Sequence, residues 1–151
     1  MANPPSPRRT FPQLADLLAN RATVGETLPG TSRTLHFRVT ARDNHPGGGA
    51  AATSDMQVTV AGNTGPFRIT APGPAVAWSG VQTVTWDVAG TTNPPVRATN
   101  VTLLLSTDGG LSFPFVLASN VPNCGSRSVR LPDVATASAR VRIQAEGNIF
   151  F

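Results

Sequence analysis

The sequence predicts an all-β protein, and three observations carry this prediction. Gly and Pro number 14 each in 151 residues, and both mark turns. Only 13% of the residues are charged and Lys is absent, whereas solvated helices are rich in Glu and Lys. Apolar residues make up 40% of the chain and fall in short alternating runs. Such runs are typical of half-buried strands and argue against a disordered chain.

Residues 1–31 are predicted to form a Pro-rich extended segment with one short helix. Residues 1–10 (MANPPSPRRT) are dense in Pro, which favours extended backbone in the residue before it. Leu14, Leu17 and Leu18 lie at helical spacing, and Pro12 stands close to their start. A helix of one or two turns is therefore expected within residues 11–20.

Residues 32–62 are predicted to form a long-looped β-hairpin. Apolar and polar residues alternate through 32–42, and a glycine-rich connection follows over 44–53. Met56, Val58 and Val60 then alternate with polar residues as the return strand. Two strands alone are marginally stable, so this hairpin is expected to be the terminal part of an incomplete, cadherin- or fibronectin-like β unit. Residues 63–66 are the expected linker.

Residues 67–151 repeat the strand signal at short intervals, with Gly- and Pro-rich turns between the runs. The expected strands cover 67–70, 82–88, 100–106, 113–118, 127–131 and 139–146. This pattern predicts an immunoglobulin- or fibronectin-III-like β-sandwich. The apolar triplet Ile149-Phe150-Phe151 reads as the start of one more strand, so the last strand is expected to be truncated and to leave an open sheet edge.

Charge does not indicate a nucleic-acid partner. The isoelectric point is about 11.3, but the net charge is only +4. The isoelectric point is high because all 12 Lys or Arg residues are Arg, which keeps its proton up to very high pH. Residues 1–62 and 63–151 each hold six Arg and four acids, without the basic stripe of a nucleic-acid interface. No apolar run approaches the roughly 20 residues of a membrane span, and residues 1–9 lack the apolar stretch of a signal peptide.

Ser106-Thr107-Asp108-Gly109-Gly110-Leu111-Ser112-Phe113 resembles the Asp-box, S-x-D-x-G-x-T-W. In that motif the Asp caps a hairpin turn, the Gly supplies a positive φ, and the aromatic residue plugs the core below. We therefore assign Ser106, Asp108, Gly110 and Phe113 to a structural turn, because the motif recurs in unrelated β-proteins and does not itself indicate glycosidase chemistry.

Asp43, Asn44 and Asp55 are the candidate ligands for a calcium ion, since they offer oxygen atoms near one end of the hairpin. A calcium ion needs six to eight oxygens, so a turn cap is the competing interpretation of the same residues. His36 and His45 belong to no HExxH helix, and no pair of acids or Ser/His/Asp set marks a catalytic centre. The chain is therefore expected to be non-catalytic and to hold no other cofactor.

Cys124 is the single cysteine, so no internal disulfide and no cysteine-rich zinc site is expected. It stands in a predicted exposed turn, where its thiol is accessible. An engineered handle, a bridge between two chains and a chance residue all remain open.

Six segments together resemble the region behind the catalytic domain of secreted bacterial reprolysin-like zinc metallopeptidases. They are FPQLADLLANR (11–21), ETLPGTSRTLHFRVTARDNHPGGG (26–49), GPFRITAP (65–72), TVTWDVAGT (83–91), NVTLLLSTDGGLSFPFVLASNVPN (100–123) and VRIQAEGNIFF (141–151). In that family the zinc helix lies upstream, so the resemblance assigns no catalytic or metal residue here and implies zinc only in an upstream domain. The family usually has Asp where Cys124 stands, and this departure favours a special or engineered thiol. The family also usually continues through a further strand after the final Phe-Phe, which suggests a trimmed or processed chain here.

The resemblance implies a non-catalytic accessory module that spaces, stabilises or tethers a metallopeptidase outside the cell. Its expected partners are the upstream peptidase domain, copies of itself, and a cell surface or matrix. An adhesion or filament-forming subunit that shares a strand at its open sheet edge is the second hypothesis. A complete small hydrolase or glycan-binding enzyme is the third.

Overall fold

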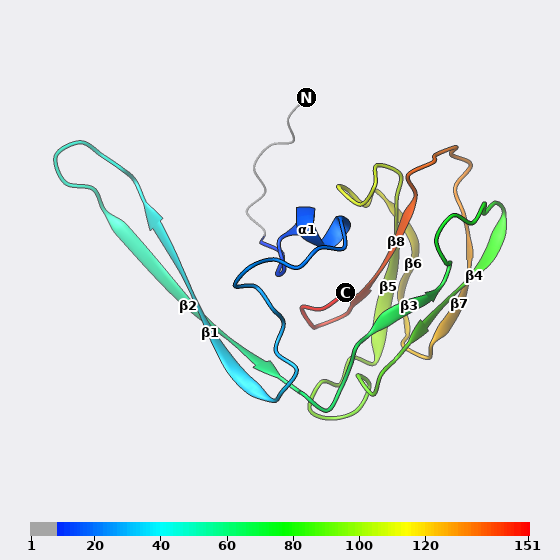
Figure 1. The fold of residues 1–151 in the computed structure, drawn as a ribbon, viewed down its shortest axis with the longest axis horizontal. Helices are drawn as coiled ribbons and strands as arrows, with labels where there is room; N and C mark the ends of the chain where they lie inside the picture. Colours follow the sequence, from blue (N-terminus) through cyan, green and yellow to red (C-terminus); the bar gives the residue numbers. More distant parts are fainter. Residues whose placement is uncertain (1–8) are drawn as a thin grey trace. The chain divides into compact units, whose positions relative to one another are not determined.

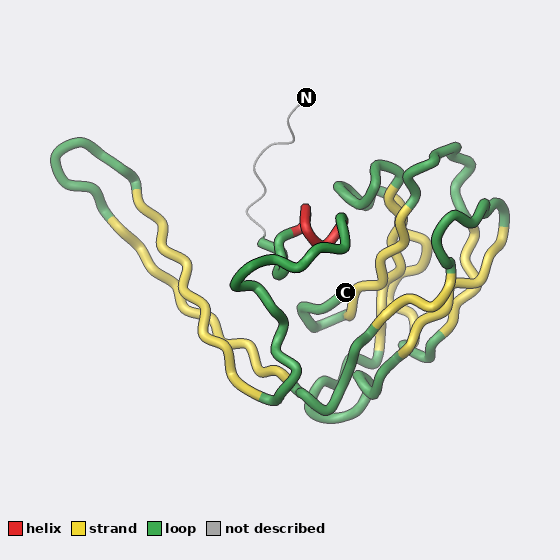
Figure 2. Tube along the Cα trace, viewed as in Figure 1, coloured by secondary structure: helices red, strands yellow, loops and turns green. Residues whose placement is uncertain are grey.

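A computed structural model describes residues 9–151, and it is nearly all β (Figure 1). Within this range, eight antiparallel strands form three small open sheets, and there is one short helix, α1 (Leu14–Leu18) (Figure 2). The strands are β1 (Arg33–Arg42), β2 (Ala51–Val60), β3 (Arg68–Ala71), β4 (Val81–Asp87), β5 (Asn100–Ser106), β6 (Phe115–Pro122), β7 (Ser126–Arg130) and β8 (Arg140–Ala145). The all-β prediction is confirmed.

The chain divides into two compact units. One is Pro29–Asn63, which contains the β1–β2 hairpin. The other is Thr64–Phe151 together with the described residues up to Leu28, and it contains α1 and the remaining two sheets.

The hairpin pairs ten residues of β1 with ten of β2, from Arg33 opposite Val60 to Arg42 opposite Ala51. The connection was predicted to extend to residue 53, and this prediction is wrong, because β2 already begins at Ala51. The ladder continues through Thr40 opposite Thr53, because β-branched and small residues there suit a paired strand as well as a loop.

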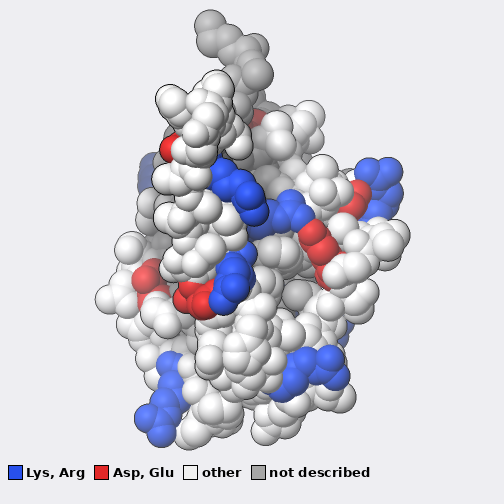
Figure 3. Space-filling model, turned by 90° about the vertical axis from the view of Figure 1, so that its left-hand side faces the viewer, with Lys and Arg blue, Asp and Glu red and all other residues white. Residues whose placement is uncertain are grey.

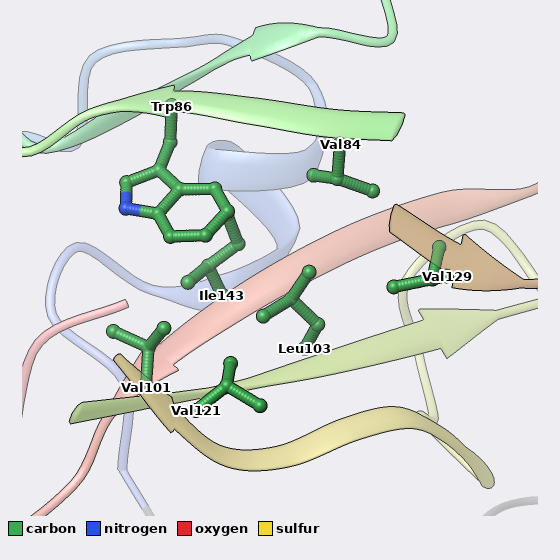
Figure 4. Close-up of a cluster of buried hydrophobic side chains, with 7 residues drawn as sticks. All are labelled: Val84, Trp86, Val101, Leu103, Val121, Val129 and Ile143. Carbon is green, nitrogen blue, oxygen red and sulfur yellow. The ribbon is translucent and has the colours of Figure 1, made fainter. Parts of the chain in front are cut away.

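The second unit has two three-stranded sheets, ordered β3-β4-β7 and β6-β5-β8. The sheets face each other across one apolar core, to which both contribute (Figure 4). Alternate residues of β4, β5 and β8 point inward, since successive side chains in a strand lie on opposite faces. The core side chains are Val84, Trp86, Val101, Leu103, Val121, Val129 and Ile143.

The strand expected at 113–118 is displaced toward the C-terminus. β6 spans Phe115–Pro122, because residues up to Ser112 are held in the turn before it and Pro114 has no amide hydrogen for a ladder. Strand β5, by contrast, has the expected bounds.

The final apolar triplet is not a strand in the structure. The chain turns back after β8, so that the backbone N–H of Ala145 donates to the carbonyl oxygen of Phe150 at 3.2 Å. The Phe150 ring meets the Phe67 ring edge to face, with centroids 5.2 Å apart. The last residues therefore close over the second unit instead of extending its sheet.

Within the second unit, the C-terminal end of helix α1 contacts residues next to the β6-β5-β8 sheet. Arg140 at the start of β8 donates a 2.9 Å hydrogen bond to the carbonyl oxygen of Leu18. A Cβ atom placed on Gly110 would lie 2.6 Å from a Leu18 methyl carbon, so a larger residue there would make the end of the Leu18 side chain shift. The backbone of Gly110 has φ +98°, which also favours glycine.

Candidate functional site: an amphipathic hairpin and the turns around the core

The β1–β2 hairpin has one apolar and one polar face. Its register sets Leu35 opposite Val58 and Phe37 opposite Met56, so these side chains share a face. Val39, on the same face, is 70% exposed and Met56 is 54% exposed. The other apolar residues of this face are half-buried, so its exposed apolar part is Val39 and Met56. We call this face the apolar hairpin face, and it consists of Leu35, Phe37, Val39, Met56, Val58 and Val60.

An ion pair occupies the opposite face of the hairpin. Arg38 donates two hydrogen bonds, of 2.7 and 2.9 Å, to the two carboxylate oxygens of Asp55, directly across the ladder. These bonds lower the pKa of Asp55 and raise the pKa of Arg38. Both side chains are exposed, so the pair adds little to stability.

The structure does not bring the three candidate calcium ligands together. The Asp43 carboxylate accepts a 3.1 Å hydrogen bond from the backbone N–H of His45, and this bond with one from Ala50 lowers the pKa of Asp43. Asn44 lies beside it in the loop, but Asp55 lies four residues from the loop end of β2 and is bound to Arg38. No group of three His, Cys, Asp or Glu side chains able to hold a metal occurs within residues 9–151. Asp43 serves here as a turn cap.

Asp108 organises the Asp-box-like turn. One carboxylate oxygen accepts the backbone N–H of Ser112 at 2.9 Å and the other accepts its hydroxyl at 2.6 Å, while Ser106 donates its own hydroxyl to Asp108 at 2.7 Å. The buried Ser106 oxygen in turn accepts the N–H of Gly110 at 2.8 Å. The side-chain and backbone bonds from Ser112, then the one from Ser106, hold the pKa of Asp108 far below its usual range.

The expected role of Phe113 is wrong. Its ring does not join the apolar core but lies under the guanidinium of Arg142, 4.1 Å from the ring centroid. The same guanidinium lies 5.3 Å from the Phe151 centroid. The aromatic residue of the turn therefore holds β8 and the final residues through a cation–π contact on the outer face.

Asn123 is a buried polar residue that the sequence pattern did not single out. Its Oδ1 accepts the indole N–H of Trp86 at 2.7 Å, and its amide donates to the Ala98 carbonyl at 2.8 Å and to the Thr91 hydroxyl at 3.2 Å. In a Pro-Asn-Cys-Gly turn, an Asn resembles an ordinary exposed turn residue. Next to it, Cys124 is exposed, with its thiol 3.5 Å from the Ser126 carbonyl oxygen.

A hollow of about 460 Å³ lies between β6 and the end of β7. Phe115, Leu117 and Leu131 supply apolar walls, and Arg130 and Asp133 supply charges.

On the face drawn in Figure 3, Arg and acidic side chains are mixed, with uncharged residues between them. This face therefore has no large patch of a single charge.

Comparisons with family models, with curated proteins and with solved structures give no match for this chain. Among residues 9–151, the single helix is far too short to cross a bilayer.

Proposed function

We propose that this chain is a non-catalytic module of a secreted bacterial protein, in which it tethers, spaces or stabilises an upstream zinc metallopeptidase domain outside the cell. The module combines an immunoglobulin- or fibronectin-III-like β-sandwich with the β1–β2 hairpin, which is the terminal part of another, incomplete β unit. The observation that carries the proposal is the apolar hairpin face, with Val39 70% and Met56 54% exposed.

An isolated two-stranded hairpin is marginal in water, and three or more strands or a packed partner are needed to stabilise it. Ten residues in each strand give a ribbon roughly 33 Å long and about 10 Å wide. Two such faces packed on each other would bury only about 660 Å² in total, below the roughly 1,200 Å² of a stable interface. An area of this size lies within the range of roughly 600–1,500 Å² that is usual between domains of one chain, so a neighbouring domain is the better occupant of this face.

The sheet order of the second unit supports the sandwich assignment. Sheets β3-β4-β7 and β6-β5-β8 enclose one core, with Trp86 of β4 buried among residues of the facing sheet. That arrangement is the one expected of a small antiparallel sandwich domain.

The hydrogen bonds that three Asp carboxylates accept support a structural role for these residues. Asp16 accepts hydrogen bonds from Gln13, Thr23 and Arg21, which lower its pKa. Asp108 is held in its turn and Asp55 by Arg38. A general acid needs a raised pKa in a cleft, and these three groups have lowered ones.

Hydrogen exchange on the parent protein and on this chain alone tests the proposal. The parent reading frame should carry an HExxH helix upstream, and the amides of β1 and β2 should exchange more slowly in the parent than in the isolated chain. The double variant V39S/M56S should remove that difference, whereas S54T, on the same face but small and polar, should keep it. Equal exchange in both proteins, or chelator-sensitive casein hydrolysis by the isolated chain, would contradict the proposal.

A second function, assembly by strand sharing, is favoured by the position of β8. Glu146 donates its N–H to the Asn100 carbonyl, so the even-numbered residues of β8 face β5 and the odd-numbered ones face the outer edge. In residues 9–151, β5 is the one strand hydrogen-bonded to β8. Val141 and Ile143 therefore direct backbone groups toward that edge, where a strand from a neighbour could add. The variant V141P, which removes one of these N–H groups, should abolish such assembly.

A further inference from the structure

Two side chains supply most of the exposed surface of the apolar hairpin face. Val39 is 70% exposed and Met56 is 54% exposed, whereas the other residues of this face are half-buried. Met56 lies opposite Phe37 and Val39 lies opposite Ser54, so Val39 and Met56 are diagonal neighbours across the ladder, about 7 to 8 Å apart. A domain that docks on this face therefore covers one small patch centred on these two side chains.

Met56 is the member of this patch whose chemistry can change. Its thioether sulfur is polarisable and reacts with peroxides, whereas the aliphatic side chain of Val39 does not. Met1 is the other methionine of the chain, and it lies outside the described residues. Within residues 9–151, a peroxide therefore meets a methionine only in the exposed part of the apolar hairpin face.

Oxidation makes the Met56 side chain polar and leaves the backbone as it was. Hydrogen peroxide transfers one oxygen atom to the sulfur, so that the O–O bond breaks, an S–O bond forms and water leaves. The sulfur gives up two electrons, the peroxide takes them up, and the product is methionine sulfoxide. The sulfoxide oxygen accepts hydrogen bonds, and covering it with an apolar surface that offers no donor is unfavourable.

The hairpin itself should tolerate this change. Backbone hydrogen bonds join β1 to β2 along ten residue pairs, and none of them involves the Met56 side chain. Because that side chain is 54% exposed, its sulfoxide oxygen can be solvated by water in the free chain. The cost of oxidation therefore arises when the face is covered.

We propose that Met56 is an oxidation-sensitive site that regulates docking of the apolar hairpin face: the thioether permits docking and the sulfoxide weakens it. The proposal rests on the proposed function, in which a neighbouring domain covers that face. Docking and oxidation oppose each other, because a covered sulfur is shielded from peroxide and an oxidised sulfur is costly to cover. A sulfoxide reductase restores the thioether, so the site is reversible.

Hydrogen peroxide treatment tests the site in a C124S background, which removes the exposed thiol. Peptide mass mapping should locate one added oxygen atom on Met56, and its oxidation should be slower in the parent protein than in this chain alone. In the parent, the extra protection of the β1 and β2 amides from hydrogen exchange should fall roughly 5- to 150-fold, or disappear, as expected for burying one unpaired polar group. In the isolated chain, the same treatment should leave their exchange unchanged.

Three variants isolate the effect of the sulfur. M56L keeps an apolar side chain of similar size, so the parent should retain its protection with and without peroxide. M56Q should lower the protection without peroxide, because it places a polar group at the same position. M56L/Q57M moves the methionine to the polar face of the hairpin, where Gln57 is exposed, and its oxidation should leave the protection unchanged.

The outcomes separate this proposal from the one on which it rests. Equal exchange in the untreated parent and the untreated chain would contradict docking, and the role of Met56 with it. Protection that is present in the untreated parent and persists once Met56 is fully oxidised would overturn only the role of Met56. Loss of protection in peroxide-treated M56L or M56L/Q57M equal to that in the unsubstituted protein would do the same, and so would equal rates of Met56 oxidation in the parent and the isolated chain.

Discussion

The buried indole N–H of Trp86 donates a 2.7 Å hydrogen bond to Oδ1 of Asn123. The bond joins β4 of one sheet to the turn that follows β6 of the other. The amide of Asn123 then reaches the Ala98 carbonyl and the Thr91 hydroxyl, so one side chain satisfies polar groups from three segments. Such a network is costly to break, because each buried group left without a partner loses its solvation.

Replacing Asn123 tests this network. N123A is expected to lower the free energy of unfolding by roughly 2 to 4 kcal/mol, since the Trp86 indole and the Ala98 carbonyl lose their partner. Urea denaturation followed by Trp fluorescence measures the change. The exposed N148A is the control and should change it by less than about 0.5 kcal/mol. A loss below about 1 kcal/mol in N123A would show that water replaces the side chain.

Alanine substitutions at Gly109 and Gly110 distinguish the cost of backbone strain from the cost of side-chain crowding. Both have positive φ, +98° and +80°, but a Cβ on Gly110 meets Leu18 at 2.6 Å while a Cβ on Gly109 meets nothing within 4 Å. G109A should cost about 1 kcal/mol from strain alone. G110A should cost about 0.5 to 1.5 kcal/mol more and should raise hydrogen exchange in α1, because the end of the Leu18 side chain must shift. Equal costs in the two variants would contradict the contact with Leu18.

Arg142 and Phe113 should be energetically coupled. A double-mutant cycle with R142Q and F113L should give a coupling free energy of about 0.5 to 2 kcal/mol, since the guanidinium lies 4.1 Å from the ring centroid. Thermal or urea unfolding of the four proteins supplies the cycle. The same cycle with F115L, a ring of β6 that makes no such stack among the described residues, is the control and should give a value near zero.

The turn of Asp108 predicts loss of stability in acid. The pKa of Asp108 is lowered in the folded protein by bonds from Ser112 and Ser106, so the folded state keeps the carboxylate ionised after the unfolded chain has taken up a proton. The stabilisation is present above the ordinary Asp pKa near 3.8 and is lost as pH falls below it. D108N should therefore have a lower urea midpoint than the unmodified protein at pH 7, and the difference should shrink between pH 4 and pH 2.5. Exposed Asp133 lies outside this turn, so D133N should follow the unmodified protein at every pH. A difference between D108N and the unmodified protein that does not depend on pH would contradict the role of the charge.

Alternation in the sequence was enough to predict the fold class and several strands. In β5, every second residue from Val101 to Leu105 is buried, and that strand has the expected bounds. Strand β6 begins later than expected, because the hydrogen bonds of Asp108 to Ser112 extend the turn, and no hydropathy pattern records them. Local periodicity thus predicts strand interiors better than strand starts.

The site residues divide in the same way. The roles of Ser106 and Asp108 depend on neighbours a few residues away, so a short motif was sufficient to place them in a turn. Phe113 was expected in the core, but its partner is Arg142 on a distant strand, and only the paired sheet brings the two together. Asn123 likewise acts on Trp86, far away in the chain, and its turn sequence carries no sign of burial.

The contact between Phe67 and Phe150 has a mechanical consequence. The two rings lie 5.2 Å apart, one just before β3 and the other just after β8, so the chain enters and leaves these two sheets at neighbouring points. While folded, the sheets add almost nothing to the end-to-end length of a polypeptide that contains them. Under tension they would act as a stored loop, which on unfolding releases roughly 280 Å of extended chain between those two rings.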